Sequence, residues 1–489
     1  MTLLYIIIGL LLLLIGIILV RTLTFADKRE NVDPLEGVAV DENKIAENLS
    51  KAIQVKTISL NESTPPGAEV LDAYHQLLRK MFPKLHESLD LEMVNDHSLL
   101  FRWRGTDESL DPVLFMAHQD VVPVQDSTLA EWQVPPFDGV IKDGYIWGRG
   151  TLDIKCQMIS TMEAVETLLS SGYQPERSIY LAFGHDEEIG GHRGAKHIAA
   201  RLKEEGIRLE AVIDEGGMLV SGMIPGVDGL MALVGVAEKG YLTLDLAVEG
   251  APGHSSTPPE HTAIGVLARA ITRLEANPMP SHPDRFAPLF KAVGKDAPFM
   301  NRMAFANLWL FKGLVVRLLR KNSKTDAAVR TTTAATVIKG GVKDNILPKD
   351  AAAQVNFRLM PGETIDHVRS RSQAVIGDDD VKVSIGKDTS WDASPLSPDD
   401  VPVYKTLERT IRQFFGNIPV APYLVLGGTD SRYYYAVSDH VYRLSPVAIT
   451  TEDFDRVHGN NERIGVRDMA KMVQFFVQLM QVWSKKDIR

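Results

Sequence analysis

The stretch VLFMAHQD at residues 113–120 decides the fold class, because an uninterrupted apolar run ends there in a histidine and an aspartate. Two further stretches repeat the pattern, IYLAFGHDEE at residues 179–188 and AVIDE at residues 211–215. Short apolar runs of this kind are typical of strands that are buried on both faces of an α/β sheet. Ligands of such sheets bind beyond the carboxyl ends of the strands, which is where these polar residues stand. The three stretches therefore predict an α/β sheet with a functional edge.

Helices are expected between and after these strands. An apolar stripe at helical spacing precedes Gly172, and it consists of Met158, Met162, Val165, Leu168 and Leu169. A final amphipathic helix is predicted from Arg467 to about Trp483. Strands that alternate with helices in this way indicate a sheet flanked by helices.

A different pattern begins near Gly240. The sequence predicts strands at 241–248, 334–338, 352–359 and 381–385 and helices at 262–274 and 365–375. This order is β-α-β-β-α-β, the split unit of a ferredoxin-like domain. The segment 277–330, rich in proline and then apolar, is expected to add helices whose position the pattern does not give. We therefore expect an inserted domain at 236–390 and a main domain in two parts, 43–235 and 391–489.

The N-terminus carries an uncharged apolar run from Leu3 to Val20, about the length that crosses the hydrocarbon core of a bilayer. We interpret residues 1–21 as a single-pass membrane anchor and the polar residues 22–42 as a linker. The alternative is a cleaved signal peptide, which usually has basic residues before its apolar core, and none precedes Leu3. Basic residues after the run favour a cytoplasmic body, but acidic residues follow them, so the side of the membrane stays open.

Composition excludes several classes of function. The 489 residues contain 53 Lys plus Arg and 63 Asp plus Glu, a formal net charge of −10, with no basic run to neutralise the phosphates of a nucleic acid. A nucleic-acid binder is therefore disfavoured. Because Cys156 is the one cysteine, a disulfide within the chain and a cysteine-ligated metal are excluded. We interpret Cys156 as a packed helix residue, and a metal would have to be held by His, Asp and Glu.

The strand ends supply the side chains that two divalent cations need. Such a site requires a bridging carboxylate, a histidine and a carboxylate for each metal, and a free carboxylate as general base. Adjacent glutamates such as Glu187 and Glu188 point to opposite sides of an extended segment, so that one can bind metal while the other faces the substrate. Each acid alone could equally cap a helix or be solvated. The candidate set is His118, Asp120, Asp153, Glu187, Glu188 and Asp214.

Three long motifs resemble one known family. MAHQDVVPV at 116–124, WGRGTLDIK at 147–155 and GHDEEIGG at 184–191 are similar to the fingerprints of the M20 metallopeptidases, especially the carboxypeptidase S and N-acyl-amino-acid hydrolase branch. The resemblance covers about residues 45–485. It implies a zinc-exopeptidase-like mixed sheet flanked by helices, with residues 236–390 as a lid and dimerisation domain.

The resemblance also implies a site with two zinc ions per chain. His118 and Asp214 would hold one ion, Glu188 and His458 the other, and Asp153 would bridge them. Glu187 would be the general base, and Asp120 would orient His118. Only the resemblance singles out His458, which lies in VHGNNE at 457–462. The peptide bond after the bridging Asp is commonly cis in the family, and Ile154 leaves that open here.

The resemblance extends to the lid and to the substrate. His254, in GHSS at 253–256, would stabilise the oxyanion, in many dimeric relatives at the partner subunit's site, so a homodimer is expected. The substrate, a small molecule or peptide, would offer a free carboxylate to Asn345, Arg358, Gly427, Gly428 and Thr429. This implies a carboxypeptidase or an N-acyl-amino-acid amidohydrolase, reversible with fatty acyl groups. Two alternatives stay open, an aminopeptidase or general deacylase and a catalytically silent binding protein.

Overall fold

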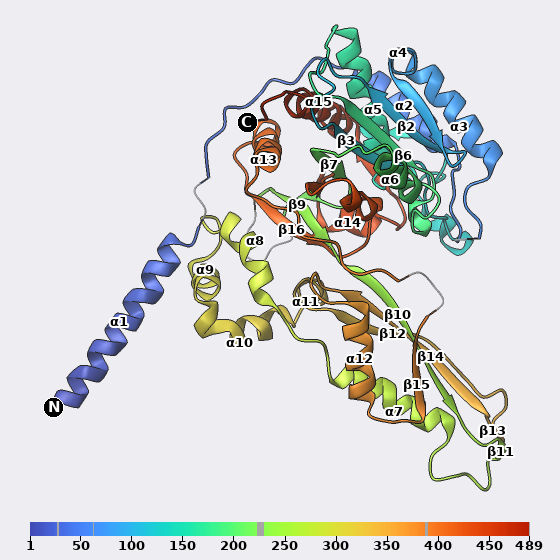
Figure 1. The fold of residues 1–489 in the computed structure, drawn as a ribbon, viewed down its shortest axis with the longest axis vertical. Helices are drawn as coiled ribbons and strands as arrows, with labels where there is room; N and C mark the ends of the chain where they lie inside the picture. Colours follow the sequence, from blue (N-terminus) through green and yellow to red (C-terminus); the bar gives the residue numbers. More distant parts are fainter. Residues whose placement is uncertain (27–28, 62, 223–228, 387–389, 489) are drawn as a thin grey trace.

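The larger part of the molecule is built on one ten-stranded mixed sheet (Figure 1). The computed structural model describes residues 1–26, 29–61, 63–222, 229–386 and 390–488. The strand order is β1-β2-β6-β3-β7-β17-β9-β8-β18, with β16 paired to β9. The strands are β1 Asp90–Val94, β2 Ser98–Trp103, β3 Val113–His118, β6 Ile179–Gly184, β7 Ala211–Asp214, β8 Met218–Val220, β9 Met231–Glu238, β16 Val420–Val425, β17 Val441–Arg443 and β18 Ala448–Ile449.

The three apolar runs are central parallel strands, as expected. Strand β3 lies between β6 and β7 and is parallel to both. Its alternate side chains enter two different cores, with Phe115 on one face and Leu114 and Met116 on the other. Burial on both faces explains why the runs are apolar throughout.

Helices cover both faces of this sheet. The first face carries α2 (Glu42–Gln54), α5 (Lys155–Ser170) and α15 (Val466–Trp483), and the second carries α6 (Ala195–Glu204) and the 3-10 turn η4 (Asp430–Ala436). The predicted C-terminal helix is confirmed. The remaining elements of this part are α3 Ala68–Met81, α4 Pro83–Ser88, η1 Asp126–Glu131, β4 Ile141–Lys142, β5 Tyr145–Trp147, η2 Glu187–Ile189, α13 Pro402–Phe415, α14 Thr451–Arg456 and β19 Arg463–Gly465.

The second part, here called the lid, is a four-stranded antiparallel sheet with the order β12-β14-β10-β15. Helices α7 and α12 pack on one face of it, which gives the two-layer α+β unit predicted from the sequence. A two-stranded ribbon, β11 with β13, stands at the end of the lid far from the large sheet (Figure 1). The elements are β10 Gly240–Glu249, β11 Gly253–His254, α7 Ala263–Ala276, β12 Thr332–Gly340, β13 Ile346–Leu347, β14 Asp350–Leu359, α12 Ile365–Ile376 and β15 Val381–Ile385.

The segment 277–330, which the sequence did not place, starts with Met279 in the lid core, but its helices pack outside that core. It forms η3 (Pro283–Phe286), α8 (Ala287–Ala292), α9 (Phe299–Ala306), α10 (Leu308–Leu319) and α11 (Ser323–Val329). Buried side chains of this segment, such as Phe290, Val315 and Leu319, join the core of the large sheet. Residues 287–329 therefore belong with the main domain, although their place in the sequence lies inside the range expected for the lid.

One described helix is long and apolar enough to cross a bilayer. This is α1, Thr2–Thr24, with a mean hydropathy of 3.3 over its best window. Figure 1 shows it projecting away from the body, with its C-terminal end beside α9.

Candidate active site

Five chain segments converge at the carboxyl edge of the large sheet. His118 ends β3, Glu187 and Glu188 form the turn η2 after β6, and Glu215 follows β7. Asp153 lies in the turn before α5, where its peptide bond to Ile154 is cis. His458 follows α14.

Asp153 lies at the centre of the cluster and uses its two carboxylate oxygens separately. Oδ1 lies 3.1 Å from Nε2 of His118, and Oδ2 lies 2.9 Å from Nε2 of His458. Each histidine also faces a glutamate: His118 Nε2 is 3.2 Å from Glu215, and His458 Nε2 is 3.2 Å from Glu188. The cluster therefore consists of two His-carboxylate halves joined by one aspartate.

Glu215, and not the expected Asp214, faces His118. Asp214 lies on the same side of β7 as Val212, towards the core that contains η4. Its carboxylate accepts a hydrogen bond of 2.9 Å from the backbone N–H of Ser431 in η4. Glu215 is the next residue and turns to the other side, into the cluster. Glu215 therefore occupies the position beside His118 that was expected for Asp214, because strand alternation directs Asp214 into the protein.

Asp120 lies directly behind the cluster, next to His118 and the turn of the two glutamates. Its carboxylate is fully buried and lies 3.3 Å from Nδ1 of His118. It also accepts hydrogen bonds from the backbone N–H groups of Glu187, at 3.1 Å, and Glu188, at 3.2 Å. Nδ1 of His118 also hydrogen-bonds to the backbone carbonyl oxygen of Asp120, at 3.0 Å. The carbonyl oxygen and the carboxylate of Asp120 together hold the ring of His118, and the carboxylate fixes the turn that carries both glutamates.

A buried ion pair between Arg149 and Glu462 connects the Asp153 turn to the His458 loop. The two side chains are 2.5 Å apart. Glu462 accepts from the N–H groups of Gly150, Leu152 and Asp153, and Arg149 donates to the carbonyl oxygen of His458. Sequence reasoning missed this positioning role, although Arg149 lies inside one of the three motifs and Glu462 lies in the stretch that contains His458.

The electrostatics of the cluster favour a bound cation. Burial and the neighbouring Asp153 raise the pKa of Glu188 to about 7 and the pKa of Glu215 to about 8. Burial also raises the pKa of Glu187 well above its ordinary value. Although burial favours its neutral acid, hydrogen bonds from the two histidines hold the pKa of Asp153 below its usual range. Buried carboxylates that crowd together in this way are stabilised by cations.

The donor set fits metal ions. His118, Asp153 and Glu188 offer ligand atoms within 4.8 Å of one another, and so do His118, Glu187 and Glu215. Oε1 of Glu188 is buried without a hydrogen-bond partner among the described residues, so it is free to ligate. Histidine nitrogen and carboxylate oxygen are donors that zinc accepts.

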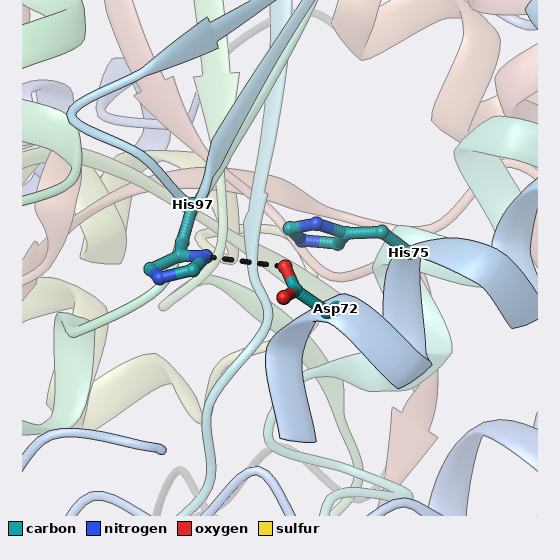
Figure 2. A group of neighbouring side chains, drawn as sticks. All are labelled: Asp72, His75 and His97. Atoms are coloured by element: carbon teal, nitrogen blue, oxygen red, sulfur yellow. Dashed lines mark ion pairs between the residues drawn. The ribbon is translucent and has the colours of Figure 1, made fainter. Parts of the chain in front are cut away.

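A second group of donors lies outside this cluster. Figure 2 shows Asp72 and His75 on α3 facing His97, which lies in the turn between β1 and β2. His97 Nδ1 is 3.9 Å from Asp72, and His75 Nε2 hydrogen-bonds to Gln119 at 2.7 Å. Asp72 is largely exposed, and among the described residues no carboxylate joins this group to a second metal-binding half. These contacts tie α3 and the hairpin to the residue that follows His118.

The lid residues divide between its two ends. His254 and Asn345 lie at the far ribbon, where His254 is exposed and pairs across the ribbon with Ile346. Arg358 lies at the opposite end of β14, opposite Tyr241. The expectation that Asn345 and Arg358 surround one anion is therefore wrong within a single chain, because most of β14, roughly 25 Å, separates them.

Two stacked aromatic side chains lie between Arg358 and the glycine-rich loop, where the lid joins the main domain. The guanidinium of Arg358 lies 4.6 Å from the centre of the Tyr241 ring, which stacks on Trp391. A Cβ on Gly428 would come within 3.1 Å of Trp391, so the loop approaches the same stack closely. Thr429 is buried and donates to Glu238, whereas Gly427 is exposed.

Comparison with known proteins identifies the family. Residues 114–482 match the model of Peptidase family M20/M25/M40. The chain belongs to this family. The resemblance of the three motifs is thereby confirmed, and the protein is a hydrolase of the metallopeptidase and amidohydrolase type.

Close and distant M20 relatives agree with this assignment. The chain is 41% identical over 483 residues to the N-fatty-acyl-amino acid synthase/hydrolase of Xenopus tropicalis, covering 96% of this chain and 93% of the relative. It is 32% identical over 505 residues to carboxypeptidase S of Saccharomyces cerevisiae, covering 91% and 85%. The fold matches an M20 metallo-carboxypeptidase from Sulfolobus solfataricus with a TM-score of 0.66 at 18% identity, covering 91% of this chain and 100% of that one. This confirms the predicted fold class.

Proposed function

We propose that this M20 enzyme binds two zinc ions and hydrolyses the amide bond to an amino acid that carries a free α-carboxylate. The position of Asp153 between the two histidines supports this most directly. One ion would be held by His118, Glu215 and one oxygen of Asp153. The other would be held by His458, Glu188 and the second oxygen of Asp153. Two-metal hydrolytic sites need such a shared ligand.

Glu187 is the proposed proton carrier. Its side chain lies beside the cluster, 3.9 Å from His118 Nε2, and its raised pKa suits a group that accepts and returns a proton. When bound, a zinc pair lowers the pKa of the attacking water and polarises the scissile carbonyl. Glu187 accepts the proton of that water while the oxygen attacks the carbonyl carbon. The C–N bond then breaks as Glu187 returns the proton to the leaving amine.

Arg358 is the proposed partner of the substrate carboxylate, together with the loop of Gly427 and Gly428. Tyr241 covers its guanidinium, and burial lowers its pKa below the ordinary value without removing the charge. A carboxylate of the substrate would complete a bidentate pair.

An apolar cavity of about 140 Å³ adjoins the cluster and suits the acyl group. Asp153 and Glu215 form one wall. The apolar part of the lining is Leu152, Ile154, Met218, Val447, Ile449 and Val457. The cavity has room for the first carbons of an acyl chain, and the N-fatty-acyl-amino acid relatives favour N-acyl amino acids with long acyl chains alongside N-blocked dipeptides. Because amide hydrolysis is reversible, the site would also condense the two products when both are concentrated.

A homodimer would supply the missing lid residues. His254 and Asn345 are exposed at the far end of the lid, where they are available to the active site of a partner subunit. Strand β12 is the first strand of the lid sheet. It pairs with β14 on one side, and no described strand pairs with its other side, where Ile338 is 62% exposed. Such an edge is a template for pairing with a second chain.

Helix α1 is proposed as a single-pass membrane anchor. Its 23 residues span roughly 35 Å, which is enough to cross the hydrocarbon core. Only Thr22 of this helix is buried in the protein. Full-length protein should therefore remain with membranes after carbonate extraction, whereas N-terminal sequencing of a shortened mature chain would indicate a cleaved signal peptide.

Two measurements test the proposed reaction. Elemental analysis of protein purified without chelator should find two zinc ions per chain, and full activity without metal would refute the mechanism.

The second measurement compares kcat/KM for an N-acyl amino acid and for its C-terminal amide, in wild type, Arg358→Ala and the matched Arg358→Lys. Wild type should prefer the free acid by about 100-fold or more, because an unpaired buried charge is costly, and Arg358→Ala should lose the preference. Equal wild-type kcat/KM values for the acid and the amide would favour an aminopeptidase or general deacylase. A protein that binds metal but turns over neither substrate would be a binding protein.

A further inference from the structure

Helix α10 exposes an apolar face that the proposed chemistry does not use. Its inner side is buried in the main core through Val315, 2% exposed, and Leu319, 9% exposed. Its outer side presents four large apolar residues that are between 45% and 57% exposed: Trp309, Leu310, Leu314 and Leu318. Leu310, Leu314 and Leu318 follow one another at four-residue spacing along one side of the helix, and exposed apolar surface of this kind marks a binding site.

The charge around this face has one sign. Between Asp296 and Asp326 the chain has no acidic residue, although its net charge is −10. The segment contains six basic residues: Arg302, Lys312, Arg317, Arg320, Lys321 and Lys324. An apolar helix face with Trp and Leu beside several Lys and Arg is typical of helices that lie in the interface of an anionic bilayer.

Hydrogen bonds fix the N-terminal end of α10 beside the C-terminal end of α1. Nδ2 of Asn307 donates to the carbonyl oxygen of Ile18 and to the hydroxyl of Thr22, both at 3.3 Å. Arg21 Nε donates to the carbonyl oxygen of Ala306 at 3.1 Å. Helix α10 therefore begins beside the last turns of α1, which is the interfacial end of a membrane-spanning helix.

We propose that α10 is a second membrane contact, lying in the headgroup layer of an anionic bilayer beside α1. Its apolar residues enter the acyl region, and its basic residues meet the lipid phosphates. Because the inner side of α10 is part of the main core, this contact would hold the catalytic body in one orientation over the membrane. The inference rests on the proposed anchor, and the test measures the lipid exposure of α1 and of α10 separately.

The test uses the full chain in vesicles of phosphatidylcholine with phosphatidylglycerol. Three single variants, Leu314→Cys in α10, Leu12→Cys in α1 and Val342→Cys in the lid, receive a spin label, since the native Cys156 is buried. The three sites are 51%, 64% and 96% exposed, so all three can be labelled. Power saturation then compares collisions with oxygen, which dissolves in lipid, and with a water-soluble nickel complex.

The ratio of oxygen to nickel collisions should be several-fold higher at Leu314→Cys than at Val342→Cys, and highest at Leu12→Cys. Replacing Lys312 and Arg317 together by Glu should lower the ratio at position 314 without changing it at position 12. A water-like ratio at 314 with a lipid-like ratio at 12 overturns the proposal and leaves the anchor intact. A lipid-like ratio at 314 with a water-like ratio at 12 supports α10 and overturns the anchor. Protection of 314 from both reagents would show that a second chain covers this face, which also overturns the proposal.

Discussion

Replacing Glu215 by Gln should separate the metal site found in the structure from the site implied by the resemblance. Glu215 lies 3.2 Å from Nε2 of His118, whereas Asp214 is bonded to the backbone of Ser431. Glutamine keeps the shape of the side chain but removes the anionic ligand. Zinc content should therefore fall from two ions per chain to about one, with loss of most activity.

The same variant should change stability in opposite directions with and without metal. Burial and Asp153 raise the pKa of Glu215 from 4.5 to about 8, so the folded protein binds this proton more tightly than the unfolded chain does. The protonated side chain of Glu215 therefore contributes to the free energy of unfolding of the metal-free protein. This contribution is complete below pH 4.5 and is lost progressively up to about pH 8. At pH 7 the loss amounts to roughly 3 kcal/mol, at about 1.4 kcal/mol for each pH unit above 4.5.

Chelated Glu215→Gln should thus be more stable than chelated wild type at pH 7, by several degrees in apparent Tm, and the difference should shrink towards pH 4.5. With zinc present the order should reverse, because wild type gains more from the bound metal. Differential scanning fluorimetry with and without chelator measures both arms.

Asp214→Asn is the matched control. Asparagine can still accept the hydrogen bond from Ser431, so this variant should keep two zinc ions and change stability by about 1 kcal/mol. The reasoning is refuted if Asp214→Asn loses an ion while Glu215→Gln retains both.

Three further predictions concern other parts of the site. Glu187→Gln should keep both metals and lose about 10²- to 10⁴-fold in kcat, since it removes a base without removing a ligand; turnover within a few-fold of wild type would contradict that role. His254→Ala should lower kcat by about 10²-fold with unchanged zinc content, and mixing it with Glu187→Gln chains should restore part of the activity in a dimer, but not in a monomer. Glu462→Gln should weaken zinc retention about 10- to 100-fold in competition with a chelator, because an amide NH2 group replaces the anionic oxygen that Arg149 pairs with, whereas Glu452→Gln, at a largely exposed residue, should match wild type.

Local sequence was sufficient to predict most of the helices and strands around the site. A strand buried on both faces has to be apolar throughout, so the runs that end at His118, Gly184 and Asp214 were recognisable from the residues alone. The lid strands and helices follow from their own periodicity, and the observed bounds, such as Ile365–Ile376 for a predicted helix at 365–375, differ by few residues. The resemblance of long motifs added His458, which no local pattern distinguishes from a surface histidine.

Tertiary structure decided which of two adjacent acids faces the cluster, because a strand apolar on both faces carries no signal for the direction of the residue that ends it. Only the packing of η4 against β7 shows that Ser431 engages Asp214 and leaves Glu215 to face His118. Only the tertiary structure also shows that Asn345 and Arg358 lie at opposite ends of the lid, because their spacing along the chain does not tell how the strands pair. The placement of residues 287–329 on the main core also depended on long-range contacts, because an apolar helix can bury its inner side against either domain.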